Sequence, residues 1–452
     1  MTPGAQYQAA IDLLQDFDGS RQPLDRFISD WARKHRFAGS KDRLKIKEIV
    51  YSVMRRRAEF SWHMGDDTPR ALVLAELFFE EDQSLNVAAD LFNGKKYCPE
   101  PLTIKEIKTF SEVRKIRADP ESENGNVSDS VRFNFPEWLL NALSIPDGST
   151  RHHEMASLSK RAPVDLRVNT LKEDRENVLL SLKAEGIRVE PCPFSDLGIR
   201  LTAKANGGYI NIRGTRAFKQ GHIELQDEAM QIACLLTGAE PNHQVLDMCA
   251  GGGGKTLALA AIMLNKGQIY ACDTHDKRLA RIKERLDRAG VRNVQSKLIS
   301  EIGEGQTEDP DFVDDLGRFD RVLLDVPCSG SGVWRRMPDA KWSLTQEKLD
   351  HYISTQRSIL ARAAPLVKPG GRLVYVTCSM FGCENGDQIS SFLNSHAEYR
   401  LLPLNEVCLV TDRLQGRLLA EEANVEKSQD LLMSPGTTHT DGAYIAVLER
   451  QR

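Results

Sequence analysis

The sequence lacks the features of a membrane or secreted protein. Its longest apolar stretch, Leu257–Leu264, is far shorter than the roughly 20 residues that a membrane-spanning helix needs. The first residues, MTPGAQYQAAIDLLQDF, contain no basic leader before an apolar run. The nine cysteines are scattered along the chain, and no CxxC pair or Cys/His cluster has the spacing of a zinc site. We therefore expect a cytoplasmic protein with reduced thiols, no membrane association and no metal site.

An excess of positive charge is also missing. The 60 Lys and Arg residues against 64 Asp and Glu residues give a formal net charge of -4 at pH 7. No global positive field indicates a nucleic-acid partner, so any such binding must come from local basic clusters. The length of 452 residues corresponds to two or three domains at roughly 150 residues each. No feature points to an obligate protein partner.

Residues 1–116 repeat apolar positions at helical spacing, for example Ile46, Val50 and Val53, which predicts an all-helical N-terminal domain. Its basic residues gather in three clusters. A solvated helix face is the favoured interpretation of this stretch taken alone, and a phosphate-contacting surface is the other. The clusters are Arg33, Lys34 and Arg36, then Lys41, Arg43, Lys45 and Lys47, then Arg55, Arg56 and Arg57.

A polar, acidic segment, RADPESENGNVSDS, marks residues 117–133 as a linker. Residues 134–228 show strand, helix and strand patterns in a short stretch, which predicts a small α+β module. In residues 229–452 strands alternate with helices, and this order favours a doubly wound, mostly parallel sheet of an α/β Rossmann-like domain. The predicted strands there are 244–248, 268–272, 321–325, 372–377 and 442–448.

The turn after the first of these strands is glycine-rich and reads DMCAGGGGKT, Asp247–Thr256. Its glycines let the backbone approach a ligand closely, and the N-terminus of the next helix points at that ligand. A P-loop is one interpretation, because GKT ends the pattern GxxxxGK[ST], but its first glycine would have to be Cys249. The other is an S-adenosylmethionine site, in which Asp273 after the second strand takes the ribose hydroxyls.

Two further motifs follow strands of the same predicted sheet. Asp325 and Cys328 belong to DVPCSGSG, and Cys378 belongs to TCS. Ligand crevices of parallel sheets open at the carboxyl ends of the strands. A single cysteine there would more often be a small buried hydrophobe. Two thiols and a carboxylate at one edge, together with the glycine turn, instead predict one chemical site.

These motifs resemble the Nop/Sun family of RNA (cytosine-5) methyltransferases, in particular its bacterial RsmB-like members. The resemblance spans about residues 161–447 and rests on CAGGGGKT, where the family pattern is CAAPGGKT, on DVPCSGSG and on TCS followed by Glu384 and Asn385. The segments QDEAM, RVNTLK and DGAYIA add to it. The helical region, with KDRLKIKEIVYSVMRRR, is similar to the NusB-like domain of some members, which implies an RNA-binding role.

The resemblance implies an S-adenosylmethionine-dependent enzyme that methylates cytosine in RNA, with ribosomal RNA expected before transfer RNA. Cys378 would add to carbon 6 of the base, Asp325 would hydrogen-bond the base, and Cys328 would assist product release. Lys255 would either stabilise the thiolate form of Cys378 or only bind the cofactor. The expected cofactor-binding residues are Cys249, Ala250, Gly251, Gly252, Gly253, Gly254, Lys255, Asp273 and Asp325.

The sequence departs from the family pattern at two places near the expected cofactor. Gly251 and Gly252 replace Ala-Pro, which loosens the turn. After the third strand the chain reads QSKLIS, where the family usually has an acid close to the adenine. The sequence therefore assigns no residue to the adenine contact. A non-catalytic RNA-binding protein, a P-loop NTPase and a DNA methyltransferase remain alternatives. The last is disfavoured because TCS, rather than a Pro-Cys motif, contains the expected nucleophile.

The segment that follows DVPCSGSG has two equally weighted interpretations. Its side chains are suited to stacking bases and holding phosphates, or they form a packed loop. They are Trp334, Arg335, Arg336, Lys341 and Trp342.

Overall fold

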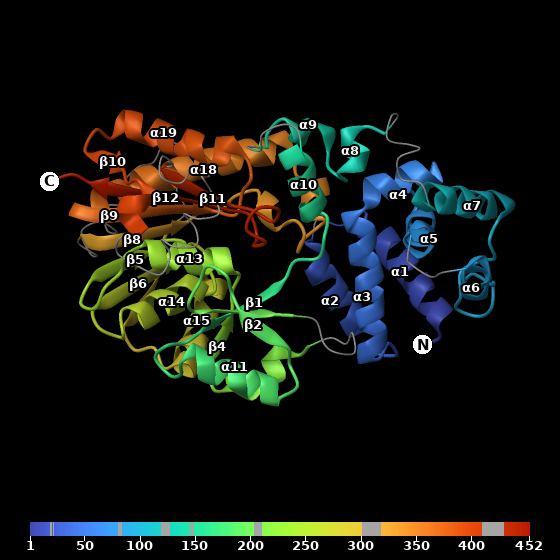
Figure 1. Ribbon diagram of the computed structural model, residues 1–452, viewed down its shortest axis with the longest axis horizontal. Helices are drawn as coiled ribbons and strands as arrows, with labels where there is room; N and C mark the ends of the chain where they lie inside the picture. Colours follow the sequence, from blue (N-terminus) through green and yellow to red (C-terminus); the bar gives the residue numbers. More distant parts are fainter. Residues whose placement is uncertain are drawn as a thin grey trace. The chain divides into compact units, whose positions relative to one another are not determined.

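The computed structural model describes residues 1–18, 20, 22–79, 84–118, 127–143, 145, 149–202, 210–300, 318–408 and 429–452. The chain forms two compact units (Figure 1). The helical unit contains Met1–Arg161 and Trp334–Leu344, and the α/β unit contains Ala162–Val333 and Thr345–Arg452. The predicted combination of a helical region, a small α+β module and a Rossmann-like domain is confirmed.

The helical unit is built from helices whose apolar stripes face a common core. Leu13, Ile49 and Leu74, from three different helices, are fully buried in it. The Thr2 side chain caps α1 by accepting a hydrogen bond from the Ala5 N–H. The helices are α1 (Pro3–Phe17), α2 (Leu24–Lys34), α3 (Ser40–Arg55), α4 (Arg57–Met64), α5 (Pro69–Phe79), α6 (Leu85–Leu91), α7 (Ile104–Ala118), α8 (Asp129–Arg132), α9 (Glu137–Leu140), α10 (Ser149–Leu158) and α17 (Ala340–Ser343).

Helices α8, α9 and α10 belong to the helical unit, whereas the sequence predicts that the α+β module begins at residue 134. Residues 119–126 of the predicted linker lie outside the described residues. The exact domain boundaries therefore stay predictions, as does the likeness of the helical region to a NusB-like domain.

The α+β module opens the α/β unit. Its four-stranded antiparallel sheet has the order β2-β3-β1-β4 and is covered by α11 (Arg175–Ala184) and α12 (Arg216–Lys219). The fully buried Leu166, Leu182 and Ile223 join the sheet to these helices. The strands are β1 (Val164–Val168), β2 (Val189–Pro191), β3 (Gly198–Leu201) and β4 (Ile223–Leu225).

The Rossmann-like domain contains an eight-stranded sheet with the order β10-β12-β9-β8-β5-β6-β7, and β11 pairs with β12. Strands β5 to β9 are parallel, and β12 joins them antiparallel to β9. The strands are β5 (Gln244–Asp247), β6 (Gln268–Asp273), β7 (Val294–Leu298), β8 (Phe319–Asp325), β9 (Val367–Thr377), β10 (Tyr399–Leu401), β11 (Asp430–Met433) and β12 (Ala443–Arg450). The strands predicted from the sequence all lie within one or two residues of these bounds at their carboxyl ends.

Helices cover both faces of this sheet (Figure 1). Successive residues of β9 face opposite sides, so that Val374 packs in one apolar cluster and Tyr375 in the other. One face carries α13 (Glu228–Leu236), α14 (Gly254–Ile262) and α15 (Asp276–Ala289), and the other carries α18 (Gln346–Ala363) and α19 (Gly386–Ser395). The strand order reverses between β5 and β8, and this places a crevice at their carboxyl ends.

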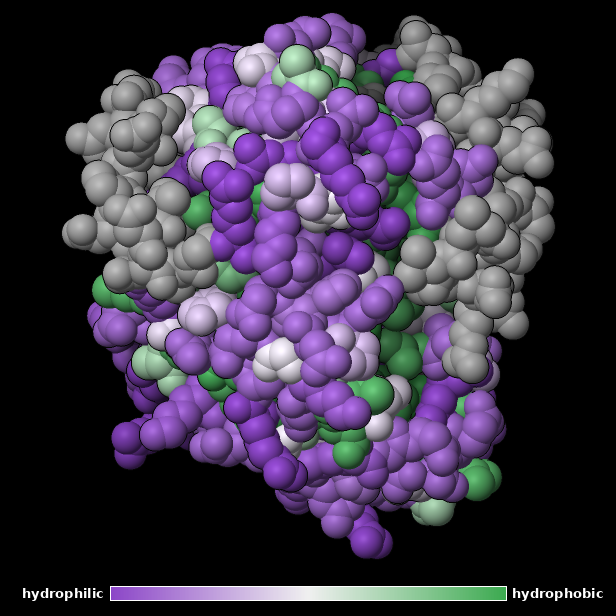
Figure 2. All heavy atoms as spheres, turned by 90° about the vertical axis from the view of Figure 1, so that its left-hand side faces the viewer, coloured by the Kyte–Doolittle hydropathy of each residue, from purple (hydrophilic) through white to green (hydrophobic). Residues whose placement is uncertain are grey.

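The described helices include none that is long and apolar enough to cross a membrane. On the face that Figure 2 shows, the described residues are mostly hydrophilic, and the hydrophobic ones are scattered among them.

Candidate active site

The glycine turn joins β5 to α14 and is fastened to β6. Gly251 has φ +54° and Gly253 has φ +80°, which are left-handed conformations that residues with a Cβ rarely adopt. The Asp273 carboxylate accepts the Gly251 N–H through Oδ2 at 2.8 Å and the His275 N–H through Oδ1 at 2.8 Å. The acid expected after the second strand therefore holds the turn and the end of β6 together.

Two arginines hold the carbonyl groups of the same turn. Arg167 of β1 is 2% exposed, and its Nη1 donates to the Gly254 carbonyl at 2.8 Å. Arg285 of α15 donates to the Gly252 carbonyl and pairs with Glu224 of β4 at 2.9 Å. Through Arg167 and Glu224 the α+β module thereby helps to hold the glycine turn, in which Gly251 and Gly252 replace the Ala-Pro of the family pattern. No sequence pattern indicates this role, although Arg167 opens the RVNTLK segment that resembles the family.

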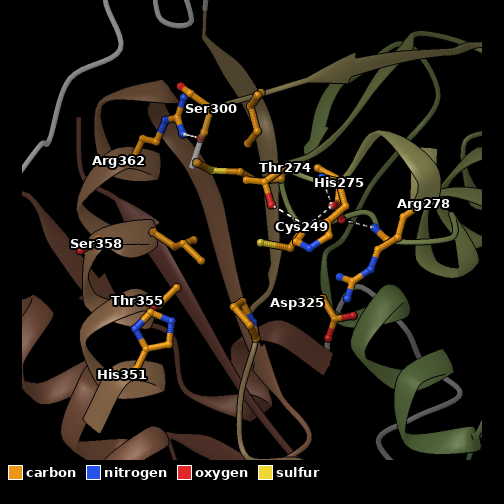
Figure 3. Close-up of a pocket in the computed structure, with 16 residues that line it drawn as sticks. Cys249, Thr274, His275, Arg278, Ser300, Asp325, His351, Thr355, Ser358 and Arg362 are labelled. Atoms are coloured by element: carbon orange, nitrogen blue, oxygen red, sulfur yellow. Dashed lines mark hydrogen bonds and ion pairs between the residues drawn. The ribbon is translucent and has the colours of Figure 1, made fainter. Parts of the chain in front are cut away.

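A cavity of about 440 Å³ lies beside the turn (Figure 3). It opens between the strand ends and α18, whose side chains form one wall. Of the residues expected to bind the cofactor, Cys249, Gly251, Asp273 and Asp325 line it, whereas Ala250, Gly252, Gly253, Gly254 and Lys255 do not. The other lining residues are Met248, Thr274, His275, Arg278, Ile299, Ser300, Pro327, His351, Thr355, Ser358, Ile359 and Arg362.

The segment after the third strand, where the family has an acid, forms part of the cavity wall. Ile299 and Ser300 line the cavity, and the Ser300 carbonyl accepts a hydrogen bond from Nη1 of Arg362 at 3.0 Å. The Ile299 N–H donates to the Asp273 carbonyl at 3.1 Å. Ser300, two residues beyond the end of β7, therefore lines this part of the cavity, and Arg362 of α18 supplies the cation next to it.

Lys255 and Asp325 form an ion pair with 2.5 Å between Nζ and Oδ2. Burial by itself would lower the pKa of Lys255, but the charges of Asp325 and Cys378 more than offset it, so the pKa is raised and the side chain stays protonated. Lys255 thus points to the carboxylate at the end of β8 rather than lining the cavity. A P-loop lysine would instead reach the phosphates of a nucleotide.

The two thiols of the predicted site lie close together. The Cys378 N–H donates to Sγ of Cys328 at 3.3 Å, and Sγ of Cys378 lies 4.0 Å from Sδ of Met230. The pKa of Cys378 is raised to about 12, chiefly by burial and next by the charge of Asp325, while the charge of Lys255 opposes the rise. Burial also raises the pKa of Cys328 well above its usual value. Lys255 lowers the pKa of Cys378, as expected from the sequence. The pKa is nevertheless raised overall, so Cys378 is a thiol in the free protein.

Comparison with known proteins identifies the family. The model of the 16S rRNA methyltransferase RsmB/F family matches residues 233–449, and the ferredoxin-like domain of the same proteins matches residues 135–206. The chain is 33% identical to ribosomal RNA small subunit methyltransferase B of Photorhabdus laumondii, with 80% of this chain and 84% of the relative covered. The chain belongs to the RsmB/F methyltransferase family.

Other relatives agree with this assignment. The probable ribosomal RNA small subunit methyltransferase B of Synechocystis sp. is 29% identical over 98% of this chain and 99% of its own length. The crystal structure of PH0851 has a TM-score of 0.72, is 26% identical and covers 99% of each chain. A methyltransferase homologue from Pyrococcus horikoshii has a TM-score of 0.57 and 26% identity over 72% of this chain and 100% of that chain. As a methyltransferase family member, the protein uses a methyl donor, and the NTPase alternative is set aside.

The segment after the Cys328 motif is a packed loop in this RsmB/F family member. Trp334 is 3% exposed and contacts the Phe135 ring at 5.1 Å. Nζ of Lys341 donates to the carbonyl of Asn134 at 2.6 Å, and the indole N–H of Trp342 donates to the carbonyl of Met54 at 2.8 Å. These side chains hold the segment in the helical unit, which favours the packed-loop interpretation over base stacking.

The three consecutive arginines of the helical unit are also bound internally. Arg55 donates to the carbonyl of Arg335 at 3.1 Å, Arg56 pairs with Glu59 at 2.6 Å, and Arg57 pairs with Asp18 at 3.2 Å. They are neither a free phosphate-binding surface nor a fully solvated face. Reversing their charge would break internal contacts, so a resulting loss of RNA binding could not be assigned to lost phosphate contacts.

Proposed function

We propose that the protein transfers a methyl group from S-adenosylmethionine to carbon 5 of a cytosine in small-subunit ribosomal RNA. The observation that supports this best is the arrangement of Cys378, Cys328 and Asp325 on adjacent strand ends, next to a cavity bordered by Asp273. The Photorhabdus laumondii relative is named a small-subunit ribosomal RNA methyltransferase and the Synechocystis relative a probable one, which supports the choice of RNA.

The residues at the cavity fit the proposed cofactor. Each Asp273 oxygen accepts one backbone N–H and keeps a second lone pair for a ribose hydroxyl. Cys249 and Gly251 offer a wall without charge, and Asp325 reaches the cavity from β8. When bound, S-adenosylmethionine supplies an electrophilic methyl group, and these residues orient it.

The two thiols and Asp325 account for the chemistry on the base. Carbon 5 of cytosine is a poor nucleophile, so Cys378 first gives up its thiol proton to Asp325 and adds to carbon 6, and the electrons of the 5,6 double bond become available at carbon 5. Asp325 shares the proton that balances the charge developing on the ring nitrogen. After methylation the Cys328 thiolate, which forms once its own proton has passed to solvent, accepts the carbon-5 proton. The electrons of that C–H bond re-form the 5,6 double bond, and the bond between carbon 6 and sulfur breaks. The proton shared with the ring nitrogen returns through Asp325 to Cys378, which leaves as a thiol.

A labelled methyl donor tests the proposal. We expect the protein to incorporate label into small-subunit ribosomal RNA as 5-methylcytidine, identified by nucleoside mass spectrometry, with transfer RNA as the competing substrate. Cys378→Ser should reduce the rate by roughly 1,000-fold or more, since the hydroxyl is a far weaker nucleophile than the thiolate. RNA binding without methyl transfer would favour the non-catalytic alternative, and a different methylated position would refute the cytosine-5 assignment.

We infer that an exposed aromatic residue in the helical unit belongs to a separate RNA-contacting surface. Phe37 is 68% exposed, and its ring lies edge-on to His35, which stacks on Trp31 with 4.4 Å between ring centroids. Lys34 and Arg36 are exposed beside it. A fixed aromatic ring among cations can stack an unpaired base and hold the adjacent phosphates. We therefore expect Phe37→Ala to weaken RNA binding by about tenfold, as a filter-binding titration would measure.

A matched control separates this surface from general hydrophobic contact. Trp62 is 39% exposed in the same unit, and the acidic Asp66 and Asp67 follow it in sequence. Trp62→Ala should leave RNA affinity unchanged. Equal loss of affinity in both variants would contradict the assignment of the surface around Phe37.

A further inference from the structure

Glu384 is a fully buried glutamate that the proposed chemistry leaves unused. It ends the short helix η4 (Gly382–Glu384) between β9 and α19, and its exposed fraction is 0%. Oε1 accepts the Ser329 N–H at 2.8 Å and the Gln356 Nε2–H at 3.0 Å. Oε2 accepts the Ser329 and Ser379 hydroxyls, each at 2.5 Å. One carboxyl group therefore receives four hydrogen bonds from three segments of the chain.

The two serines identify what Glu384 joins. Ser329 directly follows Cys328, and Ser379 directly follows Cys378. The Ser331 hydroxyl strengthens the connection, since it lies 3.2 Å from the Ser379 hydroxyl and accepts the Met380 N–H at 2.8 Å. The loops that carry Cys328 and Cys378 are thus both hydrogen-bonded to the Glu384 carboxyl group, each through the serine that follows its cysteine.

The backbone of Glu384 is also fixed. Its carbonyl accepts the Tyr375 hydroxyl at 2.7 Å, and the neighbouring Asn385 side chain bonds both the Thr377 hydroxyl and the Ser379 carbonyl. Burying a carboxyl group is costly unless its oxygens are hydrogen-bonded. A shorter acid at this position would leave buried donors unsatisfied or pull the loops toward η4.

We propose that Glu384 is a positioning residue that sets the spacing between the Cys328 and Cys378 thiols by hydrogen-bonding both of their loops. The catalytic consequence rests on the proposed function, because it assumes that both thiols act on one base. The placement of the thiols themselves does not depend on that assumption. The charge of Glu384 also contributes to the raised pKa of Cys328, after burial and the charge of Cys378.

The test measures the thiol spacing without RNA or methyl donor. Dibromobimane becomes strongly fluorescent when it links two nearby thiols, and the signal lost in Cys328→Ala and Cys378→Ala reports this pair among the nine cysteines. Glu384→Asp shortens the side chain by one methylene. We expect it to reduce bridging of the pair by about fivefold and kcat by roughly 100-fold, with the KM for the methyl donor nearly unchanged, because small misplacements of reacting groups slow chemistry strongly.

Two further variants distinguish the effect of the position of the Glu384 side chain from the effect of its charge and from a general disturbance of the surrounding packing. Glu384→Gln keeps the length. Its amide oxygen can accept the two N–H groups that Oε1 accepts, and its NH2 group can donate to the Ser329 and Ser379 hydroxyls, which then act as acceptors, so bridging should stay within about twofold of the unchanged protein. Gln388→Asn shortens another buried side chain in the same region, 2% exposed, whose Nε2 donates to the Cys383 carbonyl rather than to Ser329 or Ser379. It should leave bridging and kcat unchanged.

The outcomes are distinguishable. Folded Glu384→Asp protein with undiminished bridging would overturn the proposal, as would an equal loss in Gln388→Asn. If Glu384→Asp alone loses bridging, the positioning role holds even where the unchanged protein methylates no RNA, in which case only the proposed function fails.

Discussion

Replacing Cys328 by alanine is expected to leave the protein covalently attached to its RNA. In the proposed reaction Cys328 acts only after the methyl group has been transferred, when the carbon-5 proton leaves and the bond to Cys378 breaks. Without this thiol, one round of addition and methylation can proceed, but release should slow by roughly 100-fold or more, as on removal of a general acid or base. Multiple-turnover methylation should fall accordingly, and the adduct should accumulate.

A denaturing gel of the variant expressed in cells measures this. We expect a slower, ribonuclease-sensitive protein band in Cys328→Ala, and its absence in the double variant Cys328→Ala, Cys378→Ala. Sequencing the trapped RNA would identify the target. Cys328→Ala removes the sulfur that accepts the Cys378 N–H, at a typical cost of about 1 kcal/mol, so the protein should remain folded. A folded variant that forms no band in the presence of RNA would contradict the two-thiol mechanism.

Asp325→Asn is expected to change thiol reactivity and methylation in opposite directions. After burial, the Asp325 charge raises the pKa of Cys378 most, and its ion pair with Lys255 offsets the lysine charge that lowers this pKa. Removing the carboxylate leaves Lys255 without its ion-pair partner and removes one of the charges that raise the pKa of Cys378. This pKa should therefore fall from about 12, and the thiolate fraction at pH 8 should rise. Methylation should nevertheless fall by roughly 100-fold or more, because the base loses its charged partner.

Carbamidomethylation of Cys378, followed by mass spectrometry between pH 6 and pH 10, measures the first effect. We expect about tenfold faster alkylation at pH 8 in Asp325→Asn, the net result of a larger thiolate fraction and a weaker nucleophile. Lys255→Met provides the opposite control and should slow alkylation. Unchanged or slower alkylation in Asp325→Asn would show that Asp325 does not hold Cys378 in its protonated form.

Much of the site was predictable because its residues follow strands at fixed places in the sequence. The alternation of apolar strands with helices defines a parallel sheet, and the carboxyl ends of such strands share one edge. Asp325, Cys328 and Cys378 could therefore be assigned to one region before their contacts were known. Comparison with relatives then supported the family. The residue roles stay proposals.

Other features depend on residues far apart in the chain, and no periodicity reveals them. The link from Glu384 to Ser329 spans 55 residues, and the Arg167 contact with Gly254 spans 87. The segment Trp334–Leu344 belongs to the helical unit, although its composition by itself would fit a segment that stacks on RNA bases equally well. Arg55, Arg56 and Arg57 look like an exposed cluster in the sequence, but each has an internal partner.

The sequence by itself determined the order of elements, the glycine turn and the strand ends that bear the two thiols, because these follow from local periodicity and backbone chemistry. Only the tertiary structure decided which charges meet. It pairs Lys255 with Asp325, holds Cys378 as a thiol and closes both thiol loops on Glu384. The physical reason is burial, since ionisable and polar groups removed from water must find partners wherever the fold provides them.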